Sequence, residues 1–423
     1  MRFDTLDQWL AWQETLHPSA IDLGLERPGR VLAALGLGKP AHKLITVAGT
    51  NGKGSSVAML EAMLLAAGYR VGTYTSPHLM RYNERIRLNG APVADAPICD
   101  AFARIDAARG DTSLTYFEFG TLAAFLIFAE AELDVAVLEV GLGGRLDAVN
   151  LLDADVALIT AIDIDHAAWL GDSREAIVIE KAGIMRPQRP AVCSDPHPPQ
   201  TLIEHAAALQ TPLFCLGRDY QYRPDQEGWL YTDGEGTLAG LPRPALVGAM
   251  QLQNAAGAIR ALRCLGDSLP VSNQAIRQGL LSVTLPGRMQ RLPGEPMVLL
   301  DVAHNPQSAR ILADNLAAMS CTGRTLAVVG MLADKDIASV MAAVSAQVDH
   351  WYLAGLDVWR GADAGVVARA LDGQGIGGYS AHASVAAALV AARTDAAKAD
   401  RIVVFGSFHT VAEALVKLGV QAD

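Results

Sequence analysis

A glycine-rich segment with a single lysine, GTNGKGSS at residues 49–56, offers the clearest chemistry in the sequence. It follows the apolar run 42–48 and leads into a helical pattern. Glycines let backbone amides turn towards an anion, the start of a helix adds partial positive charge, and Lys53 can reach the terminal phosphates. This pattern predicts a nucleoside triphosphate site. The residues expected to line it are Thr50, Asn51, Gly52, Lys53, Gly54 and Ser55.

The segment departs from the common phosphate-loop pattern GxxxxGK[ST]. Gly54 stands where serine or threonine is expected, and Val47 stands where the first glycine is expected. A hydroxyl of Ser55 or Ser56 then becomes the candidate contact to Mg²⁺. A glycine-rich turn that binds nothing is the alternative, but the lysine and the strand–helix context favour nucleotide binding.

Two other polar residues stand directly after apolar runs. Glu139 ends the run 133–138, and His166 follows the run 155–162. A buried carboxylate needs a cation or a hydrogen-bonded partner, so Glu139 binds a metal ion or pairs with Arg145. His166 taken alone has a structural interpretation. Strand carboxyl ends collect ligand sites in open α/β sheets, which favours a joint site with the phosphate loop.

Apolar, β-branched runs alternate with helical patterns along most of the chain, which indicates βα units around a mostly parallel sheet. We expect an α/β protein with three segments: an N-terminal P-loop ATPase domain (1–285), a Pro/Gly-rich linker (286–296) and a smaller, doubly wound, Rossmann-like domain (297–423). Other expected features are an antiparallel insert (212–246), a polar loop (77–90), helices (55–67, 118–132) and strands (42–49, 69–76, 133–141, 155–163, 297–304, 325–332, 350–356, 401–408).

Composition narrows the class of protein. The 423 residues are 51% hydrophobic and 19% charged, with a net charge of −11. No stretch of about 20 apolar residues predicts a membrane span, and the charged N-terminus does not resemble a secretory signal. Five scattered cysteines argue against disulfides and favour a reducing cytoplasm. The negative charge argues against a nucleic-acid scaffold but is compatible with small anionic substrates.

The loop GTNGKGS resembles that of the Mur-type amide ligases, which join a carboxylate to an amine at the expense of ATP. Within that group, the chain resembles the folylpolyglutamate synthase/dihydrofolate synthase family over essentially its whole length. Only 48 residues precede Gly49, whereas the cell-wall Mur enzymes carry a substrate-binding domain there. The other motifs that carry the resemblance are TSPHLMRYNERIRLNG (75–90), FEFGTLAAF (117–125), LEVGLGGRLDAVN (138–150), DHAAWLG (165–171), EKAGI (180–184), LPGRMQ (285–290) and DVAHNP (301–306).

The resemblance implies two Mg²⁺ positions. Ser76 and Glu139 would hold the ion that accompanies ATP, and Glu139 with His166 would serve the second. Oxygen-rich, partly hydrated coordination suits Mg²⁺. Lys181 would be carbamylated, as the matching lysine of the family is, and would bind the second ion. Without the resemblance, Lys181 would be expected to be an ordinary solvated charge.

The resemblance also implies the substrate contacts. Asn254, Arg288 and Asp301 would contact ATP, with the Asn254 amide on an adenine edge or ribose. Without the resemblance, Arg288 is expected to face solvent, and Tyr116 and Phe117 fit a core as well as a stacking surface. His304 and Ser407 would face glutamate, whereas the matching motif 334–336 suggests no role. The expected pteroate or folate contacts are Asp22, Leu23, Gly24, Thr115, Tyr116, Phe117, Glu118, Leu146, Asp147 and Ala148.

The expected reaction is the ATP-dependent addition of L-glutamate to dihydropteroate, and to tetrahydrofolate and its polyglutamates, through an acyl phosphate. Lys53, Arg288, His166 and carbamylated Lys181 are its expected catalytic groups. A monofunctional folylpolyglutamate synthase is the nearest alternative. A nucleotide-dependent switch and a P-loop kinase would use the same phosphate loop with different products. At the level of the family, the chain is expected to be monomeric and cytoplasmic, with no nucleic-acid or membrane partner.

Overall fold

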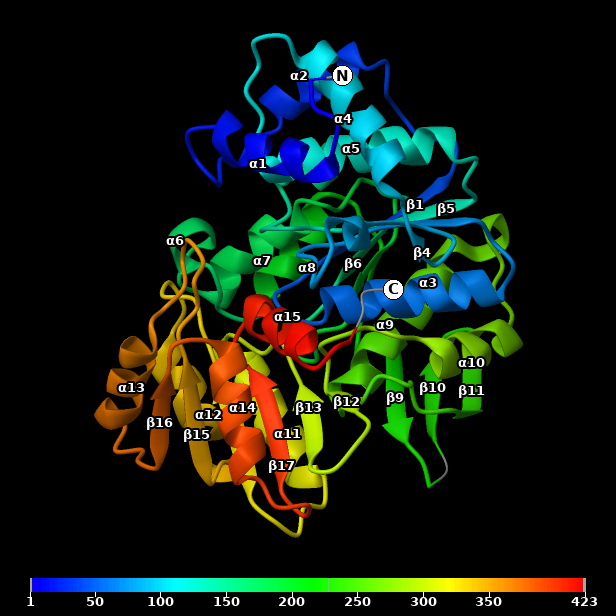
Figure 1. Ribbon diagram of the computed structural model, residues 1–423. Helices are drawn as coiled ribbons and strands as arrows, with labels where there is room; N and C mark the ends of the chain where they lie inside the picture. The colour runs from blue at the N-terminus through cyan, green and yellow to red at the C-terminus, as the bar shows by residue number, and fades with distance from the viewer. Residues whose placement is uncertain (1, 227, 421–423) are drawn as a thin grey trace. The chain divides into compact units, whose positions relative to one another are not determined.

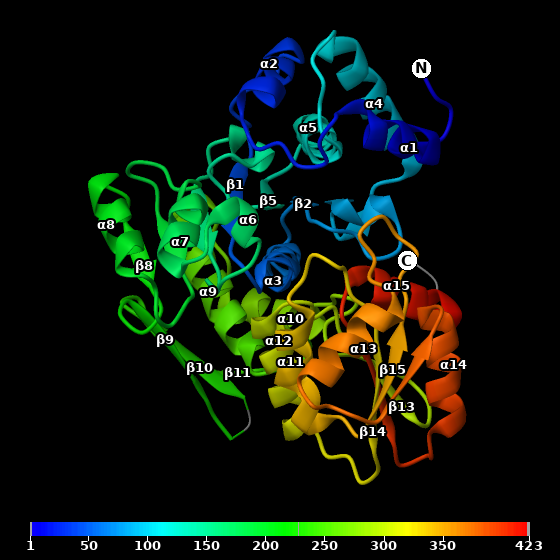
Figure 2. The ribbon, with the colours of Figure 1, turned by 90° about the vertical axis from the view of Figure 1, so that its left-hand side faces the viewer.

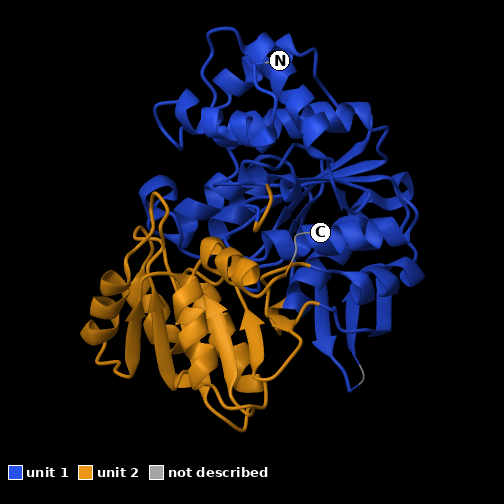
Figure 3. Cartoon of the chain, viewed as in Figure 1, with its two compact units in different colours: residues 1–78, 82–245, 251–284 blue, residues 79–81, 246–250, 285–423 orange. Residues whose placement is uncertain are grey.

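The computed structural model describes residues 2–226 and 228–420. The chain forms two compact units (Figure 3). Unit 1 comprises residues 1–78, 82–245 and 251–284, and unit 2 comprises residues 79–81, 246–250 and 285–423. Within the described residues, no helix is both long and apolar enough to cross a lipid bilayer.

An eight-stranded, mostly parallel sheet is the centre of unit 1, as the alternating pattern predicts. Six of its strands run parallel, namely β2, β5, β1, β6, β7 and β8. At one edge, β3 pairs antiparallel with β2, and β4 pairs antiparallel with β3. Ile45 and Val137 on the central strands have no exposed surface, as expected for strands covered on both faces. The spatial order is β4 (Ala91–Pro92), β3 (Ile86–Leu88), β2 (Val71–Tyr74), β5 (Val135–Glu139), β1 (Lys43–Ala48), β6 (Val156–Ile159), β7 (Ala191–Cys193) and β8 (Leu213–Cys215).

Helices cover both faces of this sheet. Figures 1 and 2 show α1, α2, α4 and α5 gathered on one face and α3 and α10 on the other. Helix α5 begins with a capping box, in which Thr115 and Glu118 exchange side-chain-to-backbone hydrogen bonds. The helices of unit 1 are α1 (Leu6–Leu16), α2 (Glu26–Ala34), α3 (Lys53–Ala66), α4 (Asp95–Arg109), α5 (Tyr116–Glu130), α6 (Ala167–Leu170), α7 (Arg174–Ala182), α8 (Gln200–Ala208), α9 (Met250–Leu265) and α10 (Asn273–Ser282).

The expected antiparallel insert is confirmed as a three-stranded sheet of β9 (Tyr220–Pro224), β10 (Trp229–Asp233) and β11 (Gly236–Leu241). A buried ion-pair network attaches it to α9. The Asp233 side chain has no exposed surface, lies 2.8 Å from Arg260 Nη1 and also pairs with Arg263. The insert therefore supports the helix that carries Asn254.

Unit 2 is a doubly wound α/β unit. Helices α11 (Pro306–Ala318), α12 (Ile337–Val344) and α13 (Ala364–Gly373) share one hydrophobic core, and α14 (Val385–Asp395) and α15 (Phe408–Lys417) share another. Its sheet is parallel except for the antiparallel edge strand β12. The order is β12 (Gln290–Leu292), β13 (Met297–Leu300), β17 (Arg401–Phe405), β14 (Thr325–Val329), β15 (His350–Ala354) and β16 (Tyr379–His382).

Two segments are more regular than the sequence predicts. The expected polar loop, 77–90, contains a 3₁₀ turn at Tyr82–Arg85 and strand β3. Two of its polar residues, Asn83 and Arg85, are buried with partners: Asn83 Nδ2 donates to Val93 O at 2.7 Å, and Arg85 Nε donates to His78 Nδ1 at 2.9 Å. The expected linker, 286–296, contains β12, because an edge strand tolerates polar residues on its exposed side.

Gly279 on α10 allows that helix to approach α3 closely. A Cβ at this position would lie 2.5 Å from Met63 Cα. We expect Gly279→Ala to lower the free energy of unfolding by about 1–3 kcal/mol, because the helices must move apart. Urea unfolding measures the change. Gly38→Ala is the control, because a Cβ there meets no atom within 4 Å; equal stability losses in both variants would contradict the prediction.

Candidate active site

The phosphate loop joins β1 to α3, which begins at Lys53, two residues earlier than predicted. At two positions of this loop, neighbouring side chains lie too close for any residue other than glycine. A Cβ on Gly49 would lie 1.8 Å from Thr160 Oγ1. Gly52 has φ +89°, and a Cβ there would lie 2.5 Å from Asn254 Oδ1. Any side chain at either position would displace the loop, and Asn254 lies directly against it.

The loop is hydrogen-bonded to the segment that follows β6. Thr50 N donates to Ala161 O at 2.8 Å, and Thr50 Oγ1 donates to Asp163 O at 2.8 Å. Thr160, which is fully buried, lies with Oγ1 2.8 Å from Asn51 O. The loop and the 160–163 segment therefore form one structural element.

The lysine of the loop is held over its backbone. Lys53 Nζ donates to Gly49 O at 3.0 Å and to Thr50 O at 3.3 Å. After burial, its charge is a further cause of the lowered pKa of Lys181, and it opposes the burial that raises the pKa of Asp147. Both side chains therefore lie within its electrostatic reach. Gly54 and Ser55 lie in the first turn of α3, and Ser55 is buried.

Glu139 ends β5, as predicted, and its side chain is buried. Ser76, which follows β2, donates from its backbone N to Glu139 Oε2 at 3.3 Å. Arg145, the alternative partner for Glu139, forms its ion pair with Glu180 at 2.9 Å. Because β5 lies between β1 and β2, the Ser76–Glu139 pair stands at the same sheet edge as the phosphate loop.

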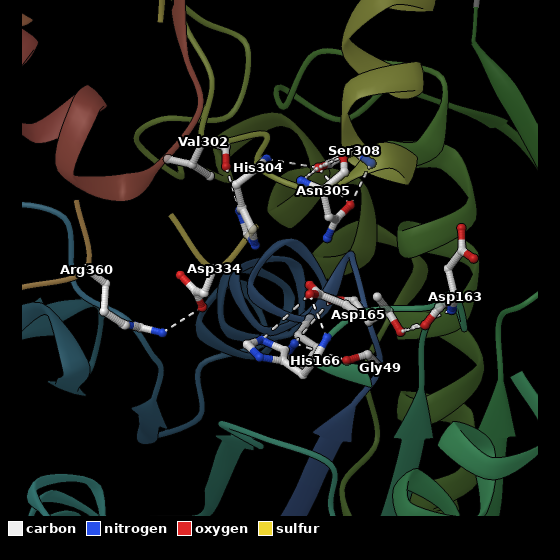
Figure 4. A network of polar contacts seen from close by, with 12 residues as sticks. Gly49, Asp163, Asp165, His166, Val302, His304, Asn305, Ser308, Asp334 and Arg360 are labelled. Atoms are coloured by element: carbon white, nitrogen blue, oxygen red, sulfur yellow. Dashed lines mark hydrogen bonds and ion pairs between the residues drawn. The ribbon is translucent and has the colours of Figure 1, made fainter. Parts of the chain in front are cut away.

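His166 stands in the loop after β6, where it precedes α6 with φ +53°. Its backbone N donates to Asp165 Oδ1 at 2.8 Å, and its Nε2 lies 4.0 Å from the same oxygen. Figure 4 shows Asp165 and His166 side by side, with Gly49 of the phosphate loop close to them. The strand-end position predicted for His166 is thus observed.

Lys181 lies in the last turn of α7 and is 3% exposed. Burial, assisted by the charge of Lys53 and opposed by Asp165, lowers the pKa of Lys181 to about 7. Glycine allows the turn after β5 to pack on this helix: a Cβ on Gly144 would lie 2.9 Å from Glu180 O. The helix therefore presents an amine that is partly neutral at neutral pH.

The residues present fit a magnesium site of few protein ligands. Glu139 supplies a buried carboxylate beside Ser76. Mg²⁺ commonly uses one or two carboxylates and keeps waters and phosphate oxygens for the remaining positions. Across residues 2–226 and 228–420, no group of three or more His, Cys, Asp or Glu side chains forms a metal site alone.

Two of the three predicted substrate segments of unit 1 meet at Arg27. Its Nη1 lies 2.6 Å from Asp22 Oδ2, and its Nη2 donates to Glu118 Oε1 at 2.9 Å. His17 Nε2 lies 3.1 Å from the same Asp22 oxygen. The structure therefore joins the 22–24 and 115–118 segments through one guanidinium. Arg27 ends the stretch 21–27 that contains the predicted contacts Asp22, Leu23 and Gly24, although it is not itself among the predicted contacts. Nothing in the sequence indicates a role for His17.

The aromatic pair at the start of α5 is half-buried. The Arg85 guanidinium lies 5.5 Å from the ring centroid of Tyr116. Phe117 packs close to Gly141, where a Cβ would lie 2.6 Å from its ring, and 6.0 Å from the ring of Tyr74. Both residues pack against the core of unit 1 and keep some exposed surface, which is compatible with a core role and with stacking on a flat ring.

The predicted segment 146–148 is a turn whose central residue, Asp147, is buried. Asp147 is 2% exposed, and its carboxylate accepts hydrogen bonds from Leu142 N at 2.8 Å and Val149 N at 2.9 Å. Burial raises the pKa of Asp147 to about 6, although the backbone bonds oppose the shift. Asp147 therefore shapes the turn from within. Of its neighbours, Leu146 is partly exposed and Ala148 is buried.

In unit 2, three predicted residues gather where β13 ends. Asp301 accepts hydrogen bonds from Met289 N at 2.9 Å and Ala303 N at 2.8 Å. Burial raises the pKa of Asp301, and Arg288 opposes the shift. His304 Nδ1 lies 2.9 Å from Val302 O (Figure 4). These contacts place Arg288, Asp301 and His304 around one turn.

Ser407 and the 334–336 motif have local roles. Ser407 is 3% exposed, and its Oγ caps α15 by accepting from Thr410 N at 3.0 Å. Asp336 caps α12, and Asp334 forms an ion pair with Arg360 at 3.0 Å (Figure 4). Ser407 thus has a role at the start of α15, and the glutamate contact predicted for it stays a prediction.

Comparison with known proteins identifies the family. Residues 47–208 match the Mur ligase middle domain, and residues 287–408 match the Mur ligase glutamate ligase domain. A dihydrofolate synthase/folylpolyglutamate synthase of Escherichia coli K12 is 48% identical over 97% of this chain and 94% of its own. The chain belongs to the dihydrofolate synthase/folylpolyglutamate synthase family.

Solved structures of this family share the fold. E. coli FolC in complex with DHPP and ADP has a TM-score of 0.94 and 47% identity, covering 98% of both chains. A bifunctional folylpolyglutamate synthase/dihydrofolate synthase with Mn, AMPPNP and L-glutamate bound has a TM-score of 0.91 and 48% identity, also covering 98% of both chains. The chain therefore has the Mur ligase fold that the sequence motifs indicate.

The pKa of Lys181 makes a prediction about stability. The unfolded chain, with an ordinary lysine pKa, binds more protons than the folded chain between about pH 7 and 10.5, so the cost of burying Lys181 is largest below pH 7 and disappears as the pH rises. In metal-free buffer depleted of CO₂, we expect Lys181→Met to be more stable than the parent. Its advantage should fall by about 2 kcal/mol between pH 7 and pH 9.

Chemical unfolding at the two pH values measures this difference. Lys43→Met serves as the control, because the Lys43 side chain is 38% exposed and carries no such burial cost. An advantage of Lys181→Met that stays constant with pH would contradict the shifted pKa.

Proposed function

We propose that this protein is an ATP-dependent amide ligase that adds L-glutamate to dihydropteroate, forming dihydrofolate, and to folates, forming polyglutamates. The observation that carries the proposal is the phosphate loop with Lys53, placed at one sheet edge with the buried Glu139 and near Lys181. Membership of the family supports both activities. Monomeric state and cytoplasmic location belong to the same proposal.

The reaction begins when the substrate carboxylate attacks the γ-phosphate of ATP, which gives an acyl phosphate and ADP. Lys53 neutralises phosphate charge during this transfer, and the backbone amides of residues 50–55 orient the phosphates. Arg288 is the proposed second cation for the transferred group. The amine of glutamate then attacks the acyl carbon, and phosphate leaves as the amide forms.

Asn254, which lies against Gly52, is proposed to contact the nucleotide near its phosphates, and Asp301 is proposed to act on it through the turn that carries Arg288. Ser76 and Glu139 would hold the Mg²⁺ of ATP, and Glu139, His166 and carbamylated Lys181 would hold a second ion. Bound Mg²⁺ supplies charge neutralisation at the phosphates. Ser76, Glu139 and His166 stand at the ends of three different strands of the unit 1 sheet, β2, β5 and β6.

The pteroate or folate is proposed to lie over the surface where Arg27 joins Asp22 to Glu118. The half-buried rings of Tyr116 and Phe117 would stack on a flat heterocycle there. Leu23, Gly24, Thr115 and the 146–148 turn complete this surface. His304 is the proposed contact to glutamate in unit 2.

Dependence of ADP release on two substrates tests the function. We expect the protein with ATP and Mg²⁺ to release ADP rapidly only when glutamate is present together with either dihydropteroate or tetrahydrofolate. A coupled assay for ADP, with mass spectrometry of the folate product, measures this. ADP release that requires glutamate and occurs with tetrahydrofolate but not with dihydropteroate would identify a monofunctional folylpolyglutamate synthase. Turnover without glutamate would contradict amide ligation and favour a switch or a kinase.

Carbamylation of Lys181 has its own test. A neutral amine reacts with CO₂, and the pKa of about 7 makes Lys181 the favoured site at neutral pH. We expect native mass spectrometry in bicarbonate buffer to show one added CO₂, lost in Lys181→Met and retained in Lys43→Met. Removing bicarbonate should reduce kcat by about tenfold or more, because one metal ligand is lost. An unmodified mass with full activity would refute the assignment.

A further inference from the structure

Asp195 is a buried carboxylate that the proposed reaction does not use. It follows β7, and its side chain is 5% exposed. It accepts hydrogen bonds from Ile162 N at 2.7 Å and His197 N at 2.8 Å, and its Oδ2 lies 3.0 Å from Arg174 Nη2. All of these partners lie in unit 1. The carboxylate therefore joins the segments that follow β6 and β7 to the start of α7.

Arg174 completes the same arrangement from its other side. Its Nε donates to Ile162 O at 2.9 Å, and its Nη2 donates to His197 O at 3.0 Å. Both backbone polar groups of Ile162 are thus bound by the Asp195–Arg174 pair. Hydrogen bonds to charged groups are stronger than neutral ones, and two bonds to one residue fix its orientation as well as its position.

Ile162 lies between two residues that contact the phosphate loop. The residues on either side of it, Ala161 and Asp163, hold the phosphate loop through Thr50. His166 follows four residues later. Arg174 is the first residue of α7, and Lys181 lies in the last turn of that helix. One ion pair is therefore connected to the phosphate loop, the His166 segment and the Lys181 helix.

We propose that Asp195, through its buried pair with Arg174, is a positioning residue that holds the phosphate loop, His166 and Lys181 in one arrangement. The expected effect of Asp195 on catalysis rests on the proposed function. The restraint that it places on residues 161–166 does not depend on the substrate. Displacement of catalytic groups by about 1 Å is enough to cost about 100-fold in rate.

Asp195→Asn tests the pair with little change in volume. The amide keeps one acceptor for two backbone donors and removes the charge opposite Arg174. We expect faster hydrogen exchange at residues 161–166 in the metal-free protein, and a rise of at least about tenfold in the dissociation constant for ADP. Hydrogen-exchange mass spectrometry and calorimetry with ADP and Mg²⁺ measure these effects. In the active enzyme, the KM for ATP should rise and kcat should fall.

Asp153→Asn is the matched control, because Asp153 is 59% exposed and forms a surface ion pair with Arg186. It should leave exchange and ADP binding unchanged. Arg174→Lys is the second test variant, since lysine cannot donate to two carbonyls and a carboxylate in this geometry. Arg174→Lys should also show faster hydrogen exchange at residues 161–166 and weaker ADP binding. It tests the proposal if Asp195→Asn does not fold.

Wild-type exchange at residues 161–166 with wild-type ADP affinity, in a folded test variant, would overturn the proposal. Faster exchange spread evenly through unit 1 would do so as well, because it would indicate a general stability role. Neither measurement needs glutamate or a folate. If the parent protein shows no glutamate-dependent ADP release, the proposed function fails while the test of Asp195 remains valid.

Discussion

The hydrogen-bonded contact between the phosphate loop and the segment after β6 is the constraint on which the site of unit 1 depends. Thr160 Oγ1 occupies the place where the Cβ of any other residue at position 49 would lie. Only glycine at this position therefore lets the end of β1 approach the end of β6 so closely. Thr50 then binds both Ala161 and Asp163. The phosphate loop and the His166 segment cannot move independently, and whatever orients one orients the other.

That constraint also explains the electrostatics of Lys181. Arg174, the first residue of helix α7, is hydrogen-bonded to Ile162 in the same segment. Lys181, in the last turn of this helix, is buried within the electrostatic reach of Lys53. Desolvation and the neighbouring cation both disfavour a second positive charge, and Asp165 does not reverse the balance. The site therefore keeps one strong cation, Lys53, and one amine with a pKa of about 7. A chain of net charge −11 thus attracts anions through local placement of charge.

The sequence predicts those parts of the site that depend on strand ends. β1, β5 and β6 are apolar runs, so the positions of Lys53, Glu139 and His166 after them follow from the topology of a parallel sheet. The 77–90 segment was misjudged because polarity normally indicates a loop, whereas Asn83 is buried through specific hydrogen bonds. Ser407 caps α15, a role that motif matching does not reveal, and its predicted glutamate contact stays a prediction.

Asp195 and Thr160 illustrate what no pattern in a single sequence contains. Both act on backbone atoms of segments distant in sequence, so neither spacing nor residue type distinguishes them from ordinary core residues. In the candidate site, Asp147, Asp195 and Asp301 each accept two backbone amides at a turn.

Carboxylates bound in this way keep their turns rigid while much of their charge is offset by peptide dipoles. They can therefore stand at the sheet edges without repelling phosphate as exposed aspartates would. Glu139 differs, because its carboxylate ends a strand and meets the amide of Ser76 on another segment. It is the strand-end carboxylate for which we propose a bound cation, and such an ion would let a buried acid and an anionic substrate occupy the same region.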